Sequence, residues 1–580
     1  MFHPPELTPD TWRRAAAALV AKMLAELSFE QALEPRPAGE GRYRVDIGPV
    51  GYEFAGRRVA LDSWRLDPDS VTRDGVAADP FVLLTDLHRG WQLDPAVTAL
   101  TVTELSATLA ADAHLLATGR YAAALADLPH LELEGHQTGH PWIFASKGRL
   151  GFSASDRHRY APEARRLHRL PWIAAHVSLA THHGPDVRER ELDPRTRQRF
   201  TALLTARGVD PETYVWLPVH PWQWDEVVLP LFAQQVAENL IVPLGEGPDE
   251  YRAQQSIRTF GNITTPGRLD VKLPLSILNT MVYRGIPTEL VRAAPPSTAW
   301  VHALRDRDPF LRDECRVVLP GEIAAVAVPH PVFADLPGAP YRYRQLLGAI
   351  WREPVAGQLD KHERARTLAS LLHVDPAGRA FVAELVARSG LPAADWLRRL
   401  FGAVLPPLLH LLYRYGIAFN PHGENAIVVY VGEAPVRLAV KDFVDDLKLL
   451  DEDLPEYADL PAEALGVLMR SGPAEMCGSV FKSLLVCHFR YLAPLCAEQL
   501  GVLEEEFWGM VRAEVLAYQR RFPELVDRFA LFDLLAPSFE RVCLNRERML
   551  PAGYHDRADR DAHVDVEADP VPNPLHEVTT

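Results

Sequence analysis

Cysteine is scarce in this chain of 580 residues, and the few cysteines are spaced apart. There are five, and no two form a CxxC pair: Cys315, Cys477, Cys487, Cys496 and Cys543. An odd number without paired spacing is typical of neither a disulfide framework nor a zinc site. We therefore predict reduced thiols in a cytoplasmic protein. Nothing in the sequence marks one of them as a nucleophile, which argues against thioester chemistry.

The chain also lacks an excess of positive charge. It has 61 Lys and Arg against 77 Asp and Glu, a formal net charge of −16 and a pI near 5.8. Nucleic acids and anionic membrane surfaces attract basic proteins, so we expect neither as a partner. Local basic clusters are instead expected to bind small anions.

Long apolar runs are absent as well. The opening residues, MFHPPELTPD, have neither the basic nor the apolar region of a secretory signal. The most apolar long stretch, Phe401 to Phe419, is interrupted by two prolines, His410 and Arg414. That pattern predicts a buried helix rather than a membrane span. The chain also has no G-x-S-x-G elbow, no H-E-x-x-H pair and no Walker lysine.

What the sequence does contain is typical of a large α+β protein. Hydrophobic residues make up 47% and charged residues 24%, which are ordinary values for a globular protein. A chain of 580 residues is too long to fold around a single hydrophobic core. Helical patterns and antiparallel hairpins occur without a βαβ rhythm. We expect helices near 9–33, 95–128 and 394–417, and strands near 43–54 and 59–66. Three domains are predicted, at 1–165, 166–390 and 391–580.

The segment Ala253 to Arg284, AQQSIRTFGNITTPGRLDVKLPLSILNTMVYR, is predicted to be a hairpin that runs into a helix. Turn residues at Thr265–Arg268 separate two strands. The second strand alternates between two faces. Its apolar face carries Val271, Leu273, Leu275 and Ile277, and its other face carries Asp270, Lys272, Pro274 and Ser276.

Hydroxyl and cationic side chains are concentrated in the same segment. Ser256 and Arg258 are two residues apart, so they share a strand face. Thr280 and Arg284 are spaced i, i+4, so they share a face of the expected helix. With Lys272, these side chains favour a phosphate-binding surface, because a buried cation needs an anionic partner. The alternative is a solvated hairpin face with ordinary surface salt bridges.

A second group of polar residues flanks another predicted hairpin, within PHGENAIVVYVGEAPVRLAVKDF at 421–443. Strands at 425–431 and 436–441 place His422, Glu424 and Asn425 beside Asp442. Oxygen ligands of this kind suit a magnesium and nucleotide site. One alternative is that Asp442 and Asn425 cap a surface hairpin. Another is a kinase-like phosphotransferase, which is weakened by the missing glycine-rich loop and catalytic aspartate.

A third candidate is the glycine-rich segment GHPWIFASKGRLGF at 139–152, which holds His140, Lys147 and Arg149. Glycines permit a close approach of the backbone to a ligand. The alternative is that these side chains are structural or exposed.

Together these segments resemble the siderophore synthetases that work independently of nonribosomal peptide synthetases, the aerobactin-synthetase-like family. The motifs occur in order along nearly the whole chain: GHPWIFASKGRLGF, YAPE at 160–163, PVHPWQW, AQQSIRTF, VKLPLSILNTMVYRG, PHGEN, VKDF and NPL at 573–575. Among members, AQQSIRTF, PVHPWQW and PHGEN look most like the desferrioxamine-type branch.

The resemblance implies a thumb, fingers and palm architecture with ATP and Mg²⁺ between fingers and palm. It implies an AMP-forming reaction in which a small-molecule carboxylate is adenylated and then joined to an amine. A homodimer is expected. The favoured acid is an N-hydroxy-N-acyl diamine with a terminal carboxylate, condensed with the amine of a second copy. A non-catalytic nucleotide- or siderophore-binding protein is a third possibility.

Residue by residue, the resemblance assigns three sets of positions. The fingers motif covers Ser256, Arg258, Thr259, Lys272, Thr280 and Arg284; the N-terminal loop motif covers His140, Lys147 and Arg149; the palm motif covers His422, Glu424, Asn425 and Asp442. It further implies catalytic roles for Arg284, Lys272, His422 and Thr280, and metal ligation by Asp442, Asn425 and Glu424.

Two positions depart from the family pattern. Ile143 stands where many members carry a second histidine, which weakens the case for free citrate and favours an acyl hydroxamate or a citrate monoamide. Glu424 stands where members often have glutamine, and a carboxylate there has the chemistry to bind metal or amine directly.

Overall fold

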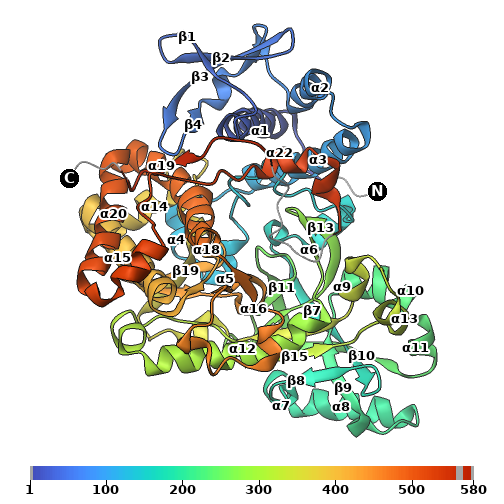
Figure 1. Cartoon of the computed structure of the whole chain (residues 1–580). Helices are drawn as coiled ribbons and strands as arrows, with labels where there is room; N and C mark the ends of the chain where they lie inside the picture. The colour runs from blue at the N-terminus through green and yellow to red at the C-terminus, as the bar shows by residue number, and fades with distance from the viewer. Residues whose placement is uncertain (1–3, 557–565, 577–580) are drawn as a thin grey trace.

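The N-terminal part combines three helices with a small antiparallel sheet (Figure 1). The structure is a computed structural model, and it describes residues 4–556 and 566–576. Helix α1 (Pro9–Phe29) begins at a capping box formed by Thr8 and Thr11, which confirms the helix predicted near 9–33. It packs against α3 (Pro95–Ala117), and α2 (Pro80–Trp91) contacts both helices.

The first predicted strands differ from the observed ones. A turn at Gly48, whose φ is +59°, divides the predicted strand 43–54 into β2 (Arg42–Ile47) and β3 (Val50–Val59). Strand β4 (Ser63–Leu66) then pairs with the far end of β3. The remaining strands of this sheet are β1 (Arg36–Gly39), β5 (Thr72–Arg73) and β6 (Val76–Ala77).

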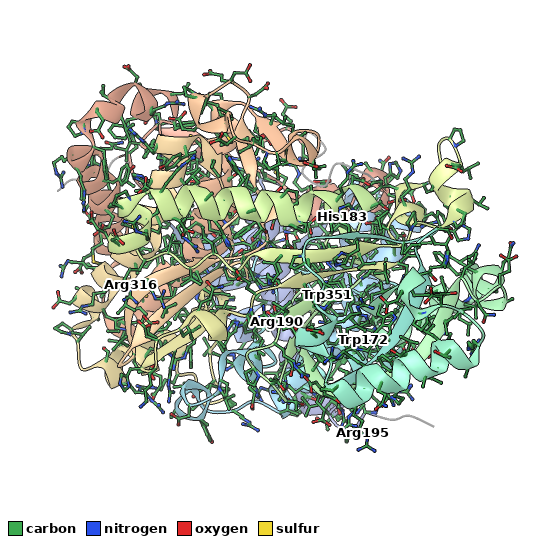
Figure 2. The ribbon with its side chains drawn as sticks, turned by 90° about the horizontal axis from the view of Figure 1, so that it is seen from below. Trp172, His183, Arg190, Arg195, Arg316 and Trp351 are labelled. Carbon is green, nitrogen blue, oxygen red and sulfur yellow. The ribbon has the colours of Figure 1, made fainter. Side chains whose placement is uncertain are left out.

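The middle of the chain forms an eight-stranded antiparallel sheet in the order β8-β15-β16-β12-β11-β10-β7-β9. Its strands are β7 (Leu167–His176), β8 (Thr181–His183), β9 (Tyr214–Pro218), β10 (Ile241–Ala253), β11 (Thr259–Asn262), β12 (Asp270–Lys272), β15 (Glu322–Ala327) and β16 (Gly348–Arg352). Trp172 on β7 and Trp351 on β16 are buried in its core. Figure 2 shows both side chains and the long helix α12 (Thr288–Arg307), which packs on β15 and β16.

The C-terminal part is largely helical and carries the second predicted hairpin. Strands β17 (Glu363–Thr367), β19 (Ala426–Val431) and β20 (Ala434–Val440) form one antiparallel sheet. Helix α15 (Ala393–Tyr415) packs on β20 and confirms the helix predicted at 394–417. It ends at Gly416 in the left-handed conformation, with φ +59°.

The most membrane-like helix is not the one that the sequence singled out. By length and composition, residues Pro473–Leu500 are apolar enough to cross a membrane. However, 83% of the most apolar window of this helix is buried inside the protein, as in a core helix. It comprises α18 (Pro473–Val480), a π-helical segment at Phe481–Phe489 and α19 (Arg490–Leu500).

Helix α22 (Leu544–Arg548), in the C-terminal part, packs against helix α1 of the N-terminal part. It lies beside α1 and α3 in Figure 1. There Arg548 donates to both carboxylate oxygens of Glu104 on α3, at 3.0 and 2.7 Å. The α+β prediction is confirmed by the mixture of helices and antiparallel sheets. The domain boundaries at 165 and 390 stay predictions. All five cysteines are free thiols.

Candidate nucleotide and metal site

The predicted basic hairpin forms, but only in part. Strands β11 and β12 pair antiparallel, with Thr259 opposite Lys272 and with the predicted turn between them. In that turn the amide of Arg268 donates to the carbonyl of Thr265 at 2.9 Å. Ser256 and Arg258 both lie before β11, so the prediction that they share a strand face is wrong. The Ser256 hydroxyl instead accepts the amide of Thr259, at 3.2 Å.

The predicted alternation of the second strand is also interrupted. Strand β12 ends at Lys272, and a separate strand, β13 (Leu275–Asn279), begins after Pro274. The expected polar face is not solvated, since Asp270, Lys272 and Pro274 are buried and Ser276 is partly buried. The solvated-face alternative is therefore wrong for Lys272.

The helix expected around Thr280 and Arg284 is a second hairpin. Strand β13 pairs with β14 (Val282–Arg284), and the turn between them has positive φ at Thr280 (+46°) and Met281 (+78°). The Arg284 guanidinium donates to the Thr280 hydroxyl across this turn. The two side chains do meet, as predicted, but through a hairpin rather than a helical i, i+4 contact.

Positive backbone φ angles occur at several residues in or beside the candidate segments, as they do elsewhere in the described part of the chain. Non-glycine residues with positive φ include Arg149, Ile257, Thr280, Met281 and Asp442. Such conformations cost about 1–3 kcal/mol each and cluster at functional sites.

Lys272 is at the centre of a buried network of ion pairs. Its ammonium is 2.7 Å from Asp445 Oδ2, 3.0 Å from Asp442 Oδ1 and 3.4 Å from Glu322 Oε1, and the side chain is 3% exposed. Burial lowers the pKa of Lys272, but the three carboxylates outweigh it and raise that pKa above its ordinary value. The anionic partner required by this buried cation is thus supplied by the protein itself.

Two buried arginines extend the network. Arg258 donates to Asp445 Oδ2 at 3.0 Å and to the carbonyl of Gly285. Arg352, on β16, donates to Gln254 at 3.0 Å and lies 3.4 Å from Asp270 and 3.5 Å from Asp442. Arg352, Glu322 and Asp445 were not among the residues predicted from the sequence. Only Asp445 had a local signal, because it lies two residues after the KDF motif.

The charges of this network nearly cancel. Four cations (Arg258, Lys272, Arg352 and Lys441) face five carboxylates (Asp270, Glu322, Asp442, Asp445 and Asp446), a formal charge of 4 − 5 = −1. Such a network does not bind phosphate through excess positive charge alone. Its carboxylates suit a divalent metal ion, and its lysine and arginine side chains suit the anionic groups that such a metal ion accompanies.

The palm hairpin forms as predicted. Strands β19 and β20 pair from Ala426 opposite Val440, and the amide of Lys441 donates to the carbonyl of Asn425 at 3.2 Å. The Asn425 side-chain amide donates to Asp446 Oδ2 at 2.6 Å. Asp442 has a left-handed backbone, φ +67°, and reaches Lys272 of the fingers hairpin. The two predicted groups of residues therefore meet.

His422 is a neutral hydrogen-bond donor in this geometry. Burial lowers its pKa, Glu424 and Asp442 raise it, and the charges of Lys441 and Arg284 lower it further. Its Nδ1 accepts the backbone amide of Glu424 at 3.3 Å, which assigns the ring proton to Nε2.

The donor set fits magnesium by its chemistry. In the described residues, 4–556 and 566–576, no three His, Cys, Asp or Glu side chains are grouped to hold a metal by themselves. However, Mg²⁺ commonly takes one or two protein carboxylates and completes its shell with phosphates and water. The predicted ligands Asp442, Asn425 and Glu424 offer oxygens only, as this ion prefers.

The N-terminal loop reaches the same region, but two of its cations are paired elsewhere. Lys147 is 2.7 Å from Asp112 of α3, and Arg149 donates to Glu163 at 2.9 Å. The backbone of Leu150 pairs with Leu278 on β13, which fixes the loop against the hairpin. Roles for Lys147 and Arg149 in nucleotide binding stay predictions.

His140 lies close enough to His422 and Arg284 for their charges to act on it. Burial, followed by the charges of Lys22, His422 and Arg284, lowers its pKa to about 3. Its Nδ1 accepts the amide of Ile143 at 3.1 Å, so the Nε2 proton faces Cys487 Sγ at 3.6 Å.

Comparisons with known proteins identify the family of the chain. Residues 129–373 match the IucA / IucC family, and residues 394–557 match a family described as ferric iron reductase FhuF-like transporter. The rhizobactin siderophore biosynthesis protein RhbF of Rhizobium meliloti is 37% identical, over 97% of this chain and 96% of its own. The aerobactin synthase of Escherichia coli is 35% identical, over 92% and 93%.

A further relative and one solved structure complete the comparison. A Bacillus anthracis protein named citryl-spermidine/3,4-dihydroxybenzoyl-citryl-spermidine:spermidine ligase is 32% identical, over 77% of this chain and 72% of its own. The structure of aerobactin synthetase IucC from Klebsiella pneumoniae superposes with a TM-score of 0.87 at 31% identity, and 98% of each chain is covered. The chain belongs to the IucA / IucC family of siderophore synthetases, which work independently of nonribosomal peptide synthetases.

Proposed function

We propose that this protein is an ATP- and Mg²⁺-dependent, AMP-forming ligase that joins a carboxylic acid to an amine in siderophore biosynthesis. The observation that carries the proposal is the contact between two separate motifs, in which Lys272 lies 3.0 Å from Asp442. Family membership supports a ligase of siderophore biosynthesis. Kinase chemistry loses support because the relatives are named as synthases and ligases.

The proposed reaction has two steps. A carboxylate oxygen of the acid attacks the α-phosphorus of ATP, and the bond to pyrophosphate breaks. The amine nitrogen then attacks the acyl carbon, AMP leaves, and the nitrogen loses one proton to solvent. Negative charge develops on phosphoryl oxygens in the first step, and fixed donors in a dry site stabilise it.

The chain's own residues have separable roles in this scheme. Arg284 supplies positive charge, Thr280 orients Arg284 through their hydrogen bond, and Lys272 holds Asp442 in place. His422 donates Nε2–H to a phosphoryl or acyl oxygen, because its Nδ1 is occupied by the amide of Glu424. Asp442, with Asn425 and Glu424, would hold Mg²⁺, which neutralises phosphate charge.

Two acid classes fit the proposal. The Bacillus anthracis relative is named for a citryl-spermidine substrate, which supports a citrate-derived acid such as a monoamide. The alternative is an acyl-hydroxamate acid of the desferrioxamine type, supported by the AQQSIRTF and PHGEN motifs. Both fit the replacement of the family's second histidine by Ile143. We also propose a cytoplasmic homodimer, which light scattering after gel filtration would test.

The deciding experiment is a screen of product formation with ATP and Mg²⁺. Citrate, citrate monoamides, succinyl-hydroxamates and 2-oxoglutarate are each offered with several diamines. We expect pyrophosphate and AMP in equal amounts with one acid class, and no turnover after EDTA. ADP in place of AMP would establish a phosphotransferase instead. Saturable ATP binding with no consumption in any mixture would leave a binding protein.

A further inference from the structure

Helix α1 makes an unexpected contact with the loop that carries His140. The Lys22 ammonium donates to the carbonyl of His140 and to the carbonyl of Ile143, both at 2.8 Å. These carbonyls are three residues apart, at the two ends of the turn in which the amide of Ile143 donates to His140 Nδ1. One ammonium therefore closes the turn that sets the orientation of the imidazole.

The helix that carries Lys22 is firmly held at this face. Lys22 and Glu26 of α1 and Glu30 at the C-cap of the helix are spaced i, i+4, i+8, so they form one stripe. Glu26 accepts Arg490 Nη2 at 2.7 Å and the Tyr491 hydroxyl at 2.9 Å.

The next residue of the stripe binds the same loop. Glu30 accepts the indole N–H of Trp142 at 3.0 Å and the side-chain amide of Asn545 at 2.8 Å. Side chains of α1 and its C-cap therefore hydrogen-bond to the loop at residues 140, 142 and 143.

We propose that Lys22 is a positioning residue: by closing the His140–Ile143 turn, it fixes His140 beside His422 and Arg284. Lys22 acts through the loop and is assigned no contact with the reacting atoms. The consequence for turnover rests on the proposed function, whereas the ordering of the loop does not.

The electrostatic surroundings make this contact sensitive to pH. The groups that act on Lys22 are Glu26 on its own helix, Asp112 on α3, Lys147 on the loop and Cys487 on the π-helical segment. Burial, opposed by Glu26 and reinforced by Lys147, lowers the pKa of Lys22 to about 8. Above that pH the charge-assisted hydrogen bonds to the two carbonyls become ordinary ones, which are roughly half as strong.

The test compares Lys22→Met, Lys22→Arg and the matched control Arg14→Met, which changes an exposed residue of the same helix. Hydrogen exchange of peptides covering 139–150 is measured without substrate. We expect exchange at least tenfold faster in Lys22→Met, unchanged exchange in the control and partial protection in Lys22→Arg. Loss of pyrophosphate-release kcat/KM by about 10- to 100-fold should accompany faster exchange.

The pH profile separates positioning from a merely structural role. In the wild type, activity should fall as pH rises through about 8, and this limb should be missing in Lys22→Met and shifted upward in Lys22→Arg. Exchange and kcat/KM within twofold of wild type in Lys22→Met would overturn the proposal. If Lys22→Met does not fold, wild-type exchange at pH 7 and 9, corrected for intrinsic rates, decides: equal protection overturns it.

The outcomes also distinguish the two proposals. One outcome is faster exchange of the loop in Lys22→Met together with no pyrophosphate release by the wild type with any acid. It would refute the proposed function and support the positioning of the loop by Lys22. Normal turnover and unchanged exchange in Lys22→Met would refute the positioning role of Lys22 and leave the proposed function standing.

Discussion

At the scale of single residues, the site is governed by the pairing of buried charges. Lys272 holds three carboxylates together, and without it Asp442, Asp445 and Glu322 would face one another in a buried place. We predict that Lys272→Met lowers the free energy of unfolding by about 3–5 kcal/mol, the usual cost of breaking a buried ion pair.

The same variant has a predictable pH dependence. Without the lysine, the folded-state pKa values of the carboxylates rise above their unfolded values, so stability is lost as pH increases. The deficit in urea denaturation should therefore be larger at pH 8 than at pH 5. Lys361→Met, at an exposed position, should change stability by less than about 0.5 kcal/mol. A deficit that is small and independent of pH would contradict the assigned network.

Arg284 should affect catalysis far more than folding. It is partly exposed and lies at the end of the short β13–β14 hairpin, where its guanidinium donates to the Thr280 hydroxyl. We predict that Arg284→Ala lowers kcat by about 10²–10³-fold, as for removal of one charge-stabilising donor. The melting temperature should stay near that of wild type. Normal kcat with a folded protein would remove Arg284 from the proposed chemistry.

At the scale of elements, hairpins were predictable where their turns carry typical turn residues. The turns at 265–268 and 432–435 contain Gly and Pro, and both hairpins form where expected. The β13–β14 turn at Thr280–Met281 contains neither residue, so its i, i+4 spacing was interpreted as helical. Tertiary contacts, including the backbone pairing of Leu150 with Leu278, hold this turn in place of local preference.

The strain in that turn leads to a prediction. Thr280 is β-branched and has a φ of +46°, a conformation that asparagine adopts more easily. Thr280→Asn keeps a polar acceptor for Arg284 and should raise the free energy of unfolding by about 1 kcal/mol. Thr280→Val keeps the branching, loses the acceptor and should destabilise the protein. Equal stability of Thr280→Asn and wild type in urea would show that the turn stores no strain.

At the scale of the whole molecule, the sequence indicated which faces are buried but not what they are buried against. The stripe Lys22, Glu26 and Glu30 lies on a helix that was predicted correctly. Its partners Arg490 and Asn545 lie more than 450 residues away. No local pattern encodes such a pairing, which is why three successive domains were predicted although the last segment of the chain packs on the first helix.

This junction between the two ends of the chain should respond to pH through Glu30. Burial raises the pKa of Glu30 to about 7, although the amides of Asn545 and Arg546 oppose it. The folded protein therefore binds a proton that the unfolded chain has released between about pH 4.5 and 7, and stability falls as pH rises through that window. The change amounts to about 3 kcal/mol.

In Glu30→Gln this titration is absent, so wild type should lose stability relative to the variant between pH 5 and 8. Glu34→Gln, an exposed neighbour, should keep the wild-type slope in urea denaturation. Parallel curves for wild type and Glu30→Gln would mean that Glu30 stays ionised, held by its four hydrogen bonds from Trp142, Asn545 and Arg546.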